Sequence, residues 1–344
     1  MEVGIAGLTG TGRTTVFRAL LAHRAPKDSG ARHGGAAIGT IHVQDSRLER
    51  LSARFQPKKT TPVEIRVHDL CPSLEKSFPT AEIEAMKRMD LLLLVIPAFA
   101  DANEETVTRG FERLLSELCF EDLAAVERRL ERHPREKLAE VEHQALEIAR
   151  AALSEEKLVL RAALSEPQRQ ALRGYALITD RPMIALVNSA EHAAGALPPE
   201  SLQKHATLHG IQVLTLCASL EAEMAELAPE ERSSFLAEYG VREPASGAVT
   251  RAILDCAEVI PFFTVGEDEC RAWPIRRGTT AREAAGKIHS DIQRGFIRAE
   301  VVAYKDLEPL EGGLSEARKL GKLRLEGKDY VIQDGEVVHY RFNV

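Results

Sequence analysis

The residues best suited to chemistry lie at the start of the chain, where a glycine-rich turn joins a short apolar strand to a helix. They follow the pattern Gly7-x4-Gly12-Arg13-Thr14, the spacing of a phosphate-binding P-loop with arginine in the place of lysine. Glycine lets backbone N–H groups turn inward around an anion, and the helix N-terminus adds partial positive charge. The spacing therefore predicts a phosphate site in which the Thr14 hydroxyl is available to a magnesium ion.

The residues expected to line this site are Gly7, Gly10, Thr11, Gly12, Arg13, Thr14 and Thr15. The alternative interpretation is a strand-to-helix loop that binds no ligand. The signal gains weight when a strand precedes the turn and a helix follows it, so the elements around the turn must be considered next.

A series of apolar strands separated by helices provides the scaffold that such a turn needs. The run at 90–96 is continuous and apolar, as a central parallel strand should be. The run at 63–69 alternates apolar and polar residues, which we interpret as an edge-side strand ending in the carboxylate of Asp69. Further strands are expected at 40–43, 183–187 and 212–216. These intervals predict a doubly wound α/β sheet that binds ligands at the carboxyl ends of its strands.

Two helical regions are predicted between these strands. Residues 45–55 have helical spacing with Asp45 as the N-cap. Between 104 and 175 no strand signal is seen, and leucine and alanine recur at helical spacing on both sides of a break at His133-Pro134. We therefore expect a helical hairpin that is inserted into the sheet domain and projects from it.

The character of the sequence changes near residue 262. One helix is expected over 280–294, among short β-like runs at 262–265, 269–274, 300–303, 330–332 and 337–342. This alternation predicts a compact mixed α+β domain.

Composition limits the class of protein. The chain has 344 residues, enough for two or three domains, and its 44% hydrophobic and 28% charged residues are typical of a soluble globular protein. A formal charge of −7 argues against a surface that coats polyanions as a whole, although it permits a local basic patch. Scattered cysteines without CxxC spacing indicate a reducing compartment. Because the longest apolar run, at 91–100, is too short to span a bilayer, we expect a cytoplasmic protein with no membrane partner.

The C-terminal stretch carries a family resemblance. The runs Phe262-Phe-Thr-Val-Gly-Glu-Asp-Glu-Cys-Arg-Ala-Trp-Pro-Ile and Gly321-Lys-Leu-Arg-Leu-Glu-Gly-Lys-Asp-Tyr-Val closely resemble the terminal domain of the YchF/Obg-like ATPase family. In the front half, Asp45-Ser-Arg-Leu and Asn188-Ser-Ala-Glu extend the resemblance over nearly the whole chain. The resemblance implies a P-loop nucleotide-binding domain at 1–106 and 176–261, a coiled-coil arm at 107–175, and a β-grasp (TGS-like) domain at 262–344.

The resemblance also implies cofactors and partners, because members of this family are P-loop ATPases associated with ribosomes. We expect ATP or ADP with Mg²⁺, and a ribosome or RNA partner that binds the helical arm and the C-terminal domain. The segment from Asn188 to Glu191 occupies the base-reading position, and Ser189 and Glu191 replace the guanine-reading lysine and aspartate, which implies adenine. The backbone amides of Cys217 and Ala218 would line the other side of the base.

Asp69 takes its role from the same resemblance. It stands where the family has the aspartate of an Asp-x-x-Gly motif, and would hold the magnesium ion by contacting one of its direct ligands or through a water molecule. The alternative is a strand-end carboxylate that caps a turn.

Several positions depart from the family pattern. Arginine at position 13 is longer and planar where a compact lysine charge is expected. Pro72 replaces the glycine that lends an N–H to the γ-phosphate, and proline has no N–H. His33 falls where the switch threonine belongs, and the loop at 98–107 lacks the histidine that promotes hydrolysis in the family.

These departures leave three hypotheses. The first is a divergent member that binds nucleotide, prefers ATP to GTP, hydrolyses it poorly or not at all, and serves the translation machinery. The second is an active ATPase in which Arg13 replaces the lysine. The third is a nucleotide-independent adaptor with a vestigial P-loop. No residue is assigned a catalytic role under the first hypothesis.

Overall fold

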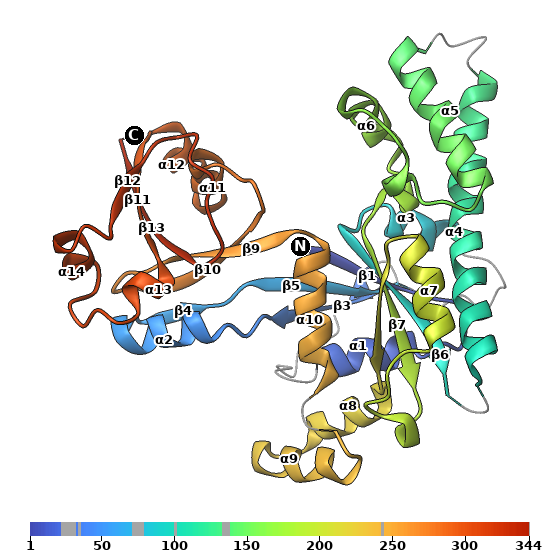
Figure 1. The fold of residues 1–344 in the computed structure, drawn as a ribbon, viewed down its shortest axis with the longest axis horizontal. Helices are drawn as coiled ribbons and strands as arrows, with labels where there is room; N and C mark the ends of the chain where they lie inside the picture. The colour runs from blue at the N-terminus through green and yellow to red at the C-terminus, as the bar shows by residue number, and fades with distance from the viewer. Residues whose placement is uncertain are drawn as a thin grey trace. The chain divides into compact units, whose positions relative to one another are not determined.

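The computed structural model of the chain describes residues 1–21, 32–33, 36–70, 79–99, 102–132, 138–241 and 244–343, without the side chains of Arg32, His33, Ala36 and Pro229 (Figure 1). The expectations for Pro72 and for the His33 side chain lie outside this part of the chain. Two compact units are formed: one from residues 1–41 and 66–253, the other from 42–65 and 254–344.

The first unit is built on a seven-stranded sheet in the order β2-β3-β5-β1-β6-β7-β8. Strand β1 lies parallel to both β5 and β6, and the parallel pairing continues from β6 through β7 to β8. The strands are β1 (Glu2–Ala6), β2 (Arg32–His33), β3 (Ala36–His42), β5 (Glu64–Asp69), β6 (Leu91–Ala98), β7 (Met183–Ser189) and β8 (Gln212–Leu216). The doubly wound α/β sheet is therefore confirmed.

One expectation about this sheet was wrong. Strand β5 is not at an edge, because it lies between β3 and β1. Its alternating pattern has another cause: Ile65, Val67 and Asp69 are buried, while Glu64 and Arg66 are exposed on the opposite face. A half-exposed interior strand and an edge strand share this pattern, so the sequence could not separate them.

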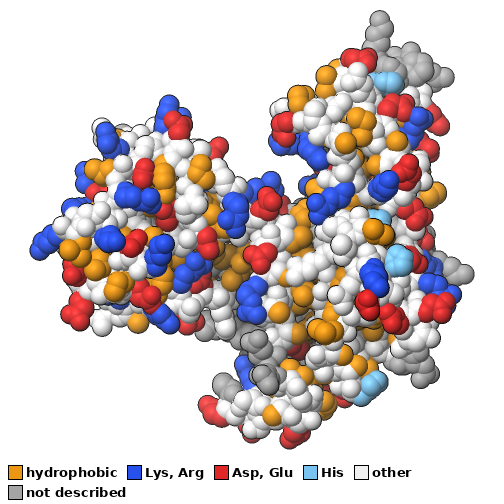
Figure 2. Space-filling model, in the orientation of Figure 1, with side chains coloured by type: hydrophobic (Ala, Val, Ile, Leu, Met, Phe, Trp, Pro, Cys, Tyr) orange, Lys and Arg blue, Asp and Glu red, His pale blue; other side chains and the backbone are white. Residues whose placement is uncertain are grey.

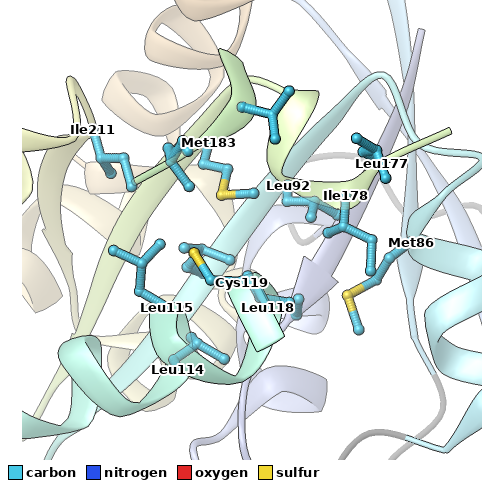
Figure 3. Packing of buried hydrophobic residues seen from close by; sticks show 14 of the residues in the cluster. Met86, Leu92, Leu114, Leu115, Leu118, Cys119, Leu177, Ile178, Met183 and Ile211 are labelled. Carbon is cyan, nitrogen blue, oxygen red and sulfur yellow. The ribbon is translucent and has the colours of Figure 1, made fainter. Parts of the chain in front are cut away.

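Strand β6 is the centre of the core. Its residues from Leu91 to Ile96 are all at most 1% exposed, which explains the continuous apolar run. On one face, Leu92 packs in a cluster with Leu114, Leu118 and Met183 (Figure 3).

Helices flank the sheet and connect its strands. Helix α1 packs against α8, while α4 contacts α7 and strand β6. The helices of the first unit outside the hairpin are α1 (Arg13–Leu21), α3 (Thr80–Met86), α7 (Glu200–Leu208), α8 (Ala218–Glu226), α9 (Pro229–Glu238) and α10 (Ala245–Cys256).

Only part of the helical hairpin projects from the sheet domain. Helix α4 (Glu104–Arg132) and helix α5 (Glu140–Ser154) form the expected pair, followed by α6 (Glu166–Leu172). Along its first half, α4 buries Val107 and Phe111 in the same cluster as the sheet. In Figure 1 the part of α4 next to α5 extends beyond the sheet. The arm is thus continuous with the core, because its apolar face first covers β6.

The second unit is an α+β fold on a six-stranded sheet in the order β12-β11-β13-β9-β10-β4. Helix α11 packs with one face of this sheet, and α2, α13 and α14 contribute to the cluster on the other. Its strands are β4 (Lys59–Thr61), β9 (Val259–Thr264), β10 (Glu269–Arg276), β11 (Phe296–Ala303), β12 (Arg324–Glu326) and β13 (Glu336–Phe342). Its helices are α2 (Ser46–Phe55), α11 (Ala281–Ile288), α12 (Ser290–Arg294), α13 (Tyr304–Leu307) and α14 (Gly313–Lys319).

Two local expectations in this unit were wrong. The helix expected over 280–294 is divided at His289, whose backbone is extended (φ −161°) and whose ring caps α12 by accepting from Asp291 N. The strand expected at 330–332 is reduced to a single bridge between Val331 and Thr280. Helical periodicity continues across a one-residue break, so the pattern did not reveal it.

Residues 42–65 pack with the second unit rather than with the P-loop domain to which the sequence division assigned them. The predicted N-cap is confirmed, since Asp45 accepts a hydrogen bond from Arg47 N. Leu48 and Leu51 of α2 join the buried cluster of Phe263 and Val337, and β4 pairs in parallel with β10. Among the described residues, no helix is both long and apolar enough to cross a bilayer.

Candidate functional site

The glycine-rich turn between β1 and α1 has the backbone of an anion cradle. Gly10 (φ 82°) and Gly12 (φ 84°) adopt left-handed conformations that favour glycine. A Cβ on Gly7 would come within 2.8 Å of both Thr11 Oγ1 and the Val95 carbonyl. The Thr11 hydroxyl closes the turn by donating to the Leu8 carbonyl at 3.0 Å. Close contacts therefore exclude side chains at Gly7 and Gly12, and the left-handed backbone disfavours them at Gly10 and Gly12.

Asn188, at the carboxyl end of β7, ties this turn to the neighbouring strand. Its Nδ2 donates to the carbonyl of Thr11 at 3.1 Å, and its Oδ1 accepts from Ala218 N at 3.2 Å. A Cβ on Gly12 would overlap the Asn188 amide. Asn188 is buried, so both halves of its amide are satisfied within the protein.

Thr14 and Asp69 meet at the carboxyl ends of β1 and β5, which pair in parallel. Thr14 Oγ1 donates to Asp69 Oδ2 at 2.8 Å, while the buried Asp69 Oδ1 has no hydrogen-bond partner among the residues that the structure describes. Burial raises the pKa of Asp69 above its ordinary value, although the Thr14 hydrogen bond opposes this. A hydroxyl beside an unsatisfied carboxylate oxygen fits Mg²⁺, which takes one or two protein oxygens and fills the rest of its octahedron with water and phosphate.

Arg13 does not point its charge into an open site. Its guanidinium Nη1 donates to Glu82 Oε1 in a buried ion pair, with the two side chains 5% and 2% exposed. Glu82 belongs to α3, the helix that follows β5 in the first unit. Burial raises the pKa of Glu82 to about 7, and its interaction with Arg13 counters only part of that shift.

Not all of the predicted residues converge. Ala218 begins α8 beside Asn188, and Cys217 is its buried N-cap residue. Thr15 lies in the first turn of α1 and is half-buried. Glu191 lies in the short 3-10 helix at 191–193, where it is exposed.

Two residues near the site were missed by sequence reasoning. Phe99 follows β6 and is 38% exposed. Its ring would lie 3.8 Å from a Cβ on Gly12, so an aromatic side chain lies beside the turn. Glu82 was missed because nothing local marks it. A buried arginine requires a carboxylate partner, but which carboxylate supplies it depends on the tertiary packing.

A mostly parallel sheet with a glycine-rich turn after β1, a strand-end aspartate on β5 and a strand-end asparagine on β7 defines a P-loop protein of the GTPase fold with an added C-terminal α+β domain. A family model for the C-terminal region of YchF GTPases, described as a protein of unknown function (DUF933), matches residues 259–343. The Ribosome-binding ATPase YchF of Bacillus subtilis is 33% identical over 372 aligned positions that cover 100% of both chains. The chain belongs to the YchF family.

Two further relatives are similar over almost the whole chain. The Ribosome-binding ATPase YchF of Haemophilus ducreyi is 32% identical, with 100% of this chain and 99% of the relative covered. The structure of the Schizosaccharomyces pombe YchF GTPase matches with a TM-score of 0.86 at 24% identity, covering 99% of this chain and 97% of that one. The similarity spans the P-loop unit, the helical hairpin and the C-terminal unit together.

Proposed function

We propose that this protein binds an adenine nucleotide with Mg²⁺ at the P-loop, hydrolyses ATP poorly or not at all, and acts on the ribosome in the cytoplasm. The observation that carries the proposal is that the groups suited to binding are in place, while the cation needed for hydrolysis is already paired with a carboxylate. Hydrogen bonds connect Thr14 to Asp69, which we propose as the metal site, and Asn188 to the turn that we propose to hold the first phosphates. The cation that would neutralise transferred charge is paired with Glu82.

Support for binding comes from the turn and its anchors. The left-handed glycines leave room for an anion at backbone N–H groups, and α1 adds its N-terminal dipole. Thr14 supplies a hydroxyl oxygen that a magnesium ion would take, and Asp69, which accepts from that hydroxyl, would hold the ion indirectly or through water. When bound, the ion would neutralise phosphate charge, while Asn188 holds the turn in shape.

The base preference rests on the segment from Asn188 to Glu191. The guanine-reading pair of lysine and aspartate is replaced by Ser189 and Glu191, so a guanine-specific contact is missing. Competition of ATP against GTP measures the preference directly. Tighter binding of GTP by tenfold or more, about 1.4 kcal/mol, would contradict the adenine assignment.

Impaired hydrolysis follows from the groups that face a third phosphate. Transfer needs the γ-phosphate held in line, its charge neutralised and a water positioned. Arg13 is engaged by Glu82, and Pro72 offers no N–H. Electrostatic groups of this kind are each worth roughly 3–4 kcal/mol, a hundredfold or more in rate.

Steady-state phosphate release from highly purified protein, with and without potassium and ribosomes, tests this part of the proposal. We expect turnover well below about one per second, the lower end of ordinary enzymes. Faster turnover that disappears in a Thr14→Ala variant would establish the rival, an ATPase that uses Arg13. Failure of ATP, ADP and GTP to bind in calorimetric titration would establish the adaptor with a vestigial P-loop.

The ribosome proposal rests on the names of the relatives and on the two appended elements, the helical hairpin and the C-terminal unit. Figure 2 shows basic and acidic side chains interspersed over the visible face of the C-terminal unit. Within that unit, Arg271 lies 4.0 Å from the centre of the Trp273 ring, and Arg276 and Arg277 are exposed. Such groups suit RNA phosphates and bases.

Co-sedimentation with ribosomes at rising salt tests this contact. Binding should weaken as salt increases, because each neutralised phosphate releases counterions. Replacing Arg276 and Arg277 by glutamate should weaken binding severalfold at low salt. Lys204→Glu, on the exposed side of α7, is the matched control. Equal sedimentation of all three proteins at every salt concentration would contradict an RNA contact through these arginines.

A further inference from the structure

The buried pair of Arg13 and Glu82 has a consequence for the ligand itself. Backbone amides of a P-loop hold the α- and β-phosphates, whereas the cation that follows the second glycine reaches the β- and γ-phosphates. In this chain that cation already donates to a carboxylate of α3, and neither side chain is more than 5% exposed.

The charges around this pair provide no net positive charge for a third phosphate. Asp69 lies close enough to the pair for its charge to interact with Glu82 and with Arg13. Arg18 also acts on Asp69, so with both carboxylates ionised the two arginines and the two carboxylates sum to zero before any phosphate or metal enters. Freeing Arg13 for a γ-phosphate would leave Glu82 buried without its partner, which is costly in a low-dielectric interior. A diphosphate held by backbone amides and a metal avoids that cost.

We propose that Glu82 is a selectivity residue that occupies the guanidinium needed by a third phosphate, so that the site takes a nucleoside diphosphate in preference to a triphosphate. The inference rests on the proposed nucleotide binding and deepens it by naming the phosphate chain. Binding of ATP then requires Glu82 to leave Arg13, and therefore requires α3 to move.

Calorimetric titration of the full chain with ADP and with ATP, in Mg²⁺ at pH 8, tests the proposal. The wild type should bind ADP at least tenfold more tightly than ATP. Glu82→Gln removes the competing charge at nearly constant volume and should reduce this ratio at least tenfold, mainly through tighter binding of ATP. Glu84→Gln, in the same helix but 51% exposed and paired with Lys87, should leave the ratio unchanged.

A second measurement needs no variant and so does not depend on how Glu82→Gln folds. Amide hydrogen exchange over residues 80–86 should rise in the wild type with saturating ATP, and stay at the ligand-free level with ADP. Equal exchange in the two complexes would overturn the proposal.

The outcomes separate the two claims. An ATP affinity equal to or above that for ADP, or a ratio unchanged in Glu82→Gln, overturns the selectivity role and leaves nucleotide binding intact. Absence of binding in both wild type and Glu82→Gln overturns both claims. Binding of ATP that appears only in Glu82→Gln supports the role of Glu82 and refutes nucleotide binding by the wild type.

Discussion

The side-chain amide of Asn188 donates to the backbone carbonyl of Thr11 at 3.1 Å across 177 residues of sequence. This contact joins the carboxyl end of β7 to the glycine-rich turn, and the same amide accepts from Ala218 N. These hydrogen bonds connect the turn that would hold phosphate to the strand end that would hold the base.

Removing this connection should weaken nucleotide binding. Asn188→Ala leaves the buried Thr11 carbonyl and Ala218 N–H without partners, at a cost of about 1–3 kcal/mol each. We expect ADP affinity to fall by roughly 10- to 100-fold in calorimetry. Asn343→Ala, at an exposed asparagine, is the control. Equal affinity in Asn188→Ala would show that the turn keeps its shape without this amide.

Restoring the P-loop lysine should not restore hydrolysis. In Arg13→Lys the ammonium still faces Glu82, and Pro72 still lacks an N–H, so two of the required groups remain disabled. Phosphate release should rise less than about tenfold and stay below about one per second. A lysine variant that exceeds this rate, and loses it with Thr14→Ala, would mean that position 13 alone controls catalysis.

Stability should depend on pH through Glu82. Its pKa rises from the ordinary 4.5 to about 7 on folding because the carboxyl is buried. Between these values the folded protein binds more protons at this group than the unfolded chain does. The contribution of Glu82 to the free energy of unfolding therefore decreases as pH increases from 4.5 to 7, by up to about 3 kcal/mol.

Urea denaturation at pH 5 and pH 8 gives the free energy of unfolding at each pH. The contribution of Glu82 is the change between the two pH values in the wild type minus the change in Glu82→Gln. The stability of the wild type should decline relative to Glu82→Gln, which cannot titrate at this position. Parallel pH profiles for the two proteins would mean that Arg13 keeps Glu82 ionised throughout, and the pKa assignment would then be wrong.

The hairpin should be anchored by a single carboxylate. Asp122 of α4 is 1% exposed and accepts from Ile178 N (3.0 Å), Thr179 N (2.7 Å) and Thr179 Oγ1 (2.6 Å). Asp122→Ala should reduce the free energy of unfolding by about 2–5 kcal/mol, since two buried N–H groups lose their acceptor. Thr179→Val should cost about 1 kcal/mol, and Glu127→Ala, exposed on the same helix, should be nearly neutral. Equal denaturation midpoints for Asp122→Ala and Glu127→Ala would contradict the anchor.

The second unit should depend on a leucine that is far in sequence from residues 254–344 of that unit. Leu51 of α2 is 2% exposed in the cluster of Phe263, so Leu51→Ala should destabilise this unit by about 2–5 kcal/mol. Fluorescence of Trp273, the only tryptophan, reports unfolding of this unit directly. Leu320→Ala, at a leucine 57% exposed, should change stability by less than about 0.5 kcal/mol. A Trp273 transition unaffected by Leu51→Ala would show that α2 is dispensable.

The sequence by itself determined the parts of this protein that depend on short-range spacing. The glycines between β1 and α1 predicted the turn, because the left-handed backbone at Gly10 and Gly12, and the close approach of Asn188 to Gly12, leave few other choices. The run at β6 predicted the central strand, because a strand covered on both faces must be apolar throughout.

Tertiary structure alone decided where charges and segments found their partners. Arg13 looked like a phosphate ligand in sequence, but the fold brings Glu82 to it from 69 residues away. Helix α2 and strand β4 precede strand β5 of the first unit, yet Leu48 and Leu51 of α2 are buried in the second. A buried ion pair and a shared core are satisfied by proximity in space, and local spacing carries no record of which distant residue supplies the contact.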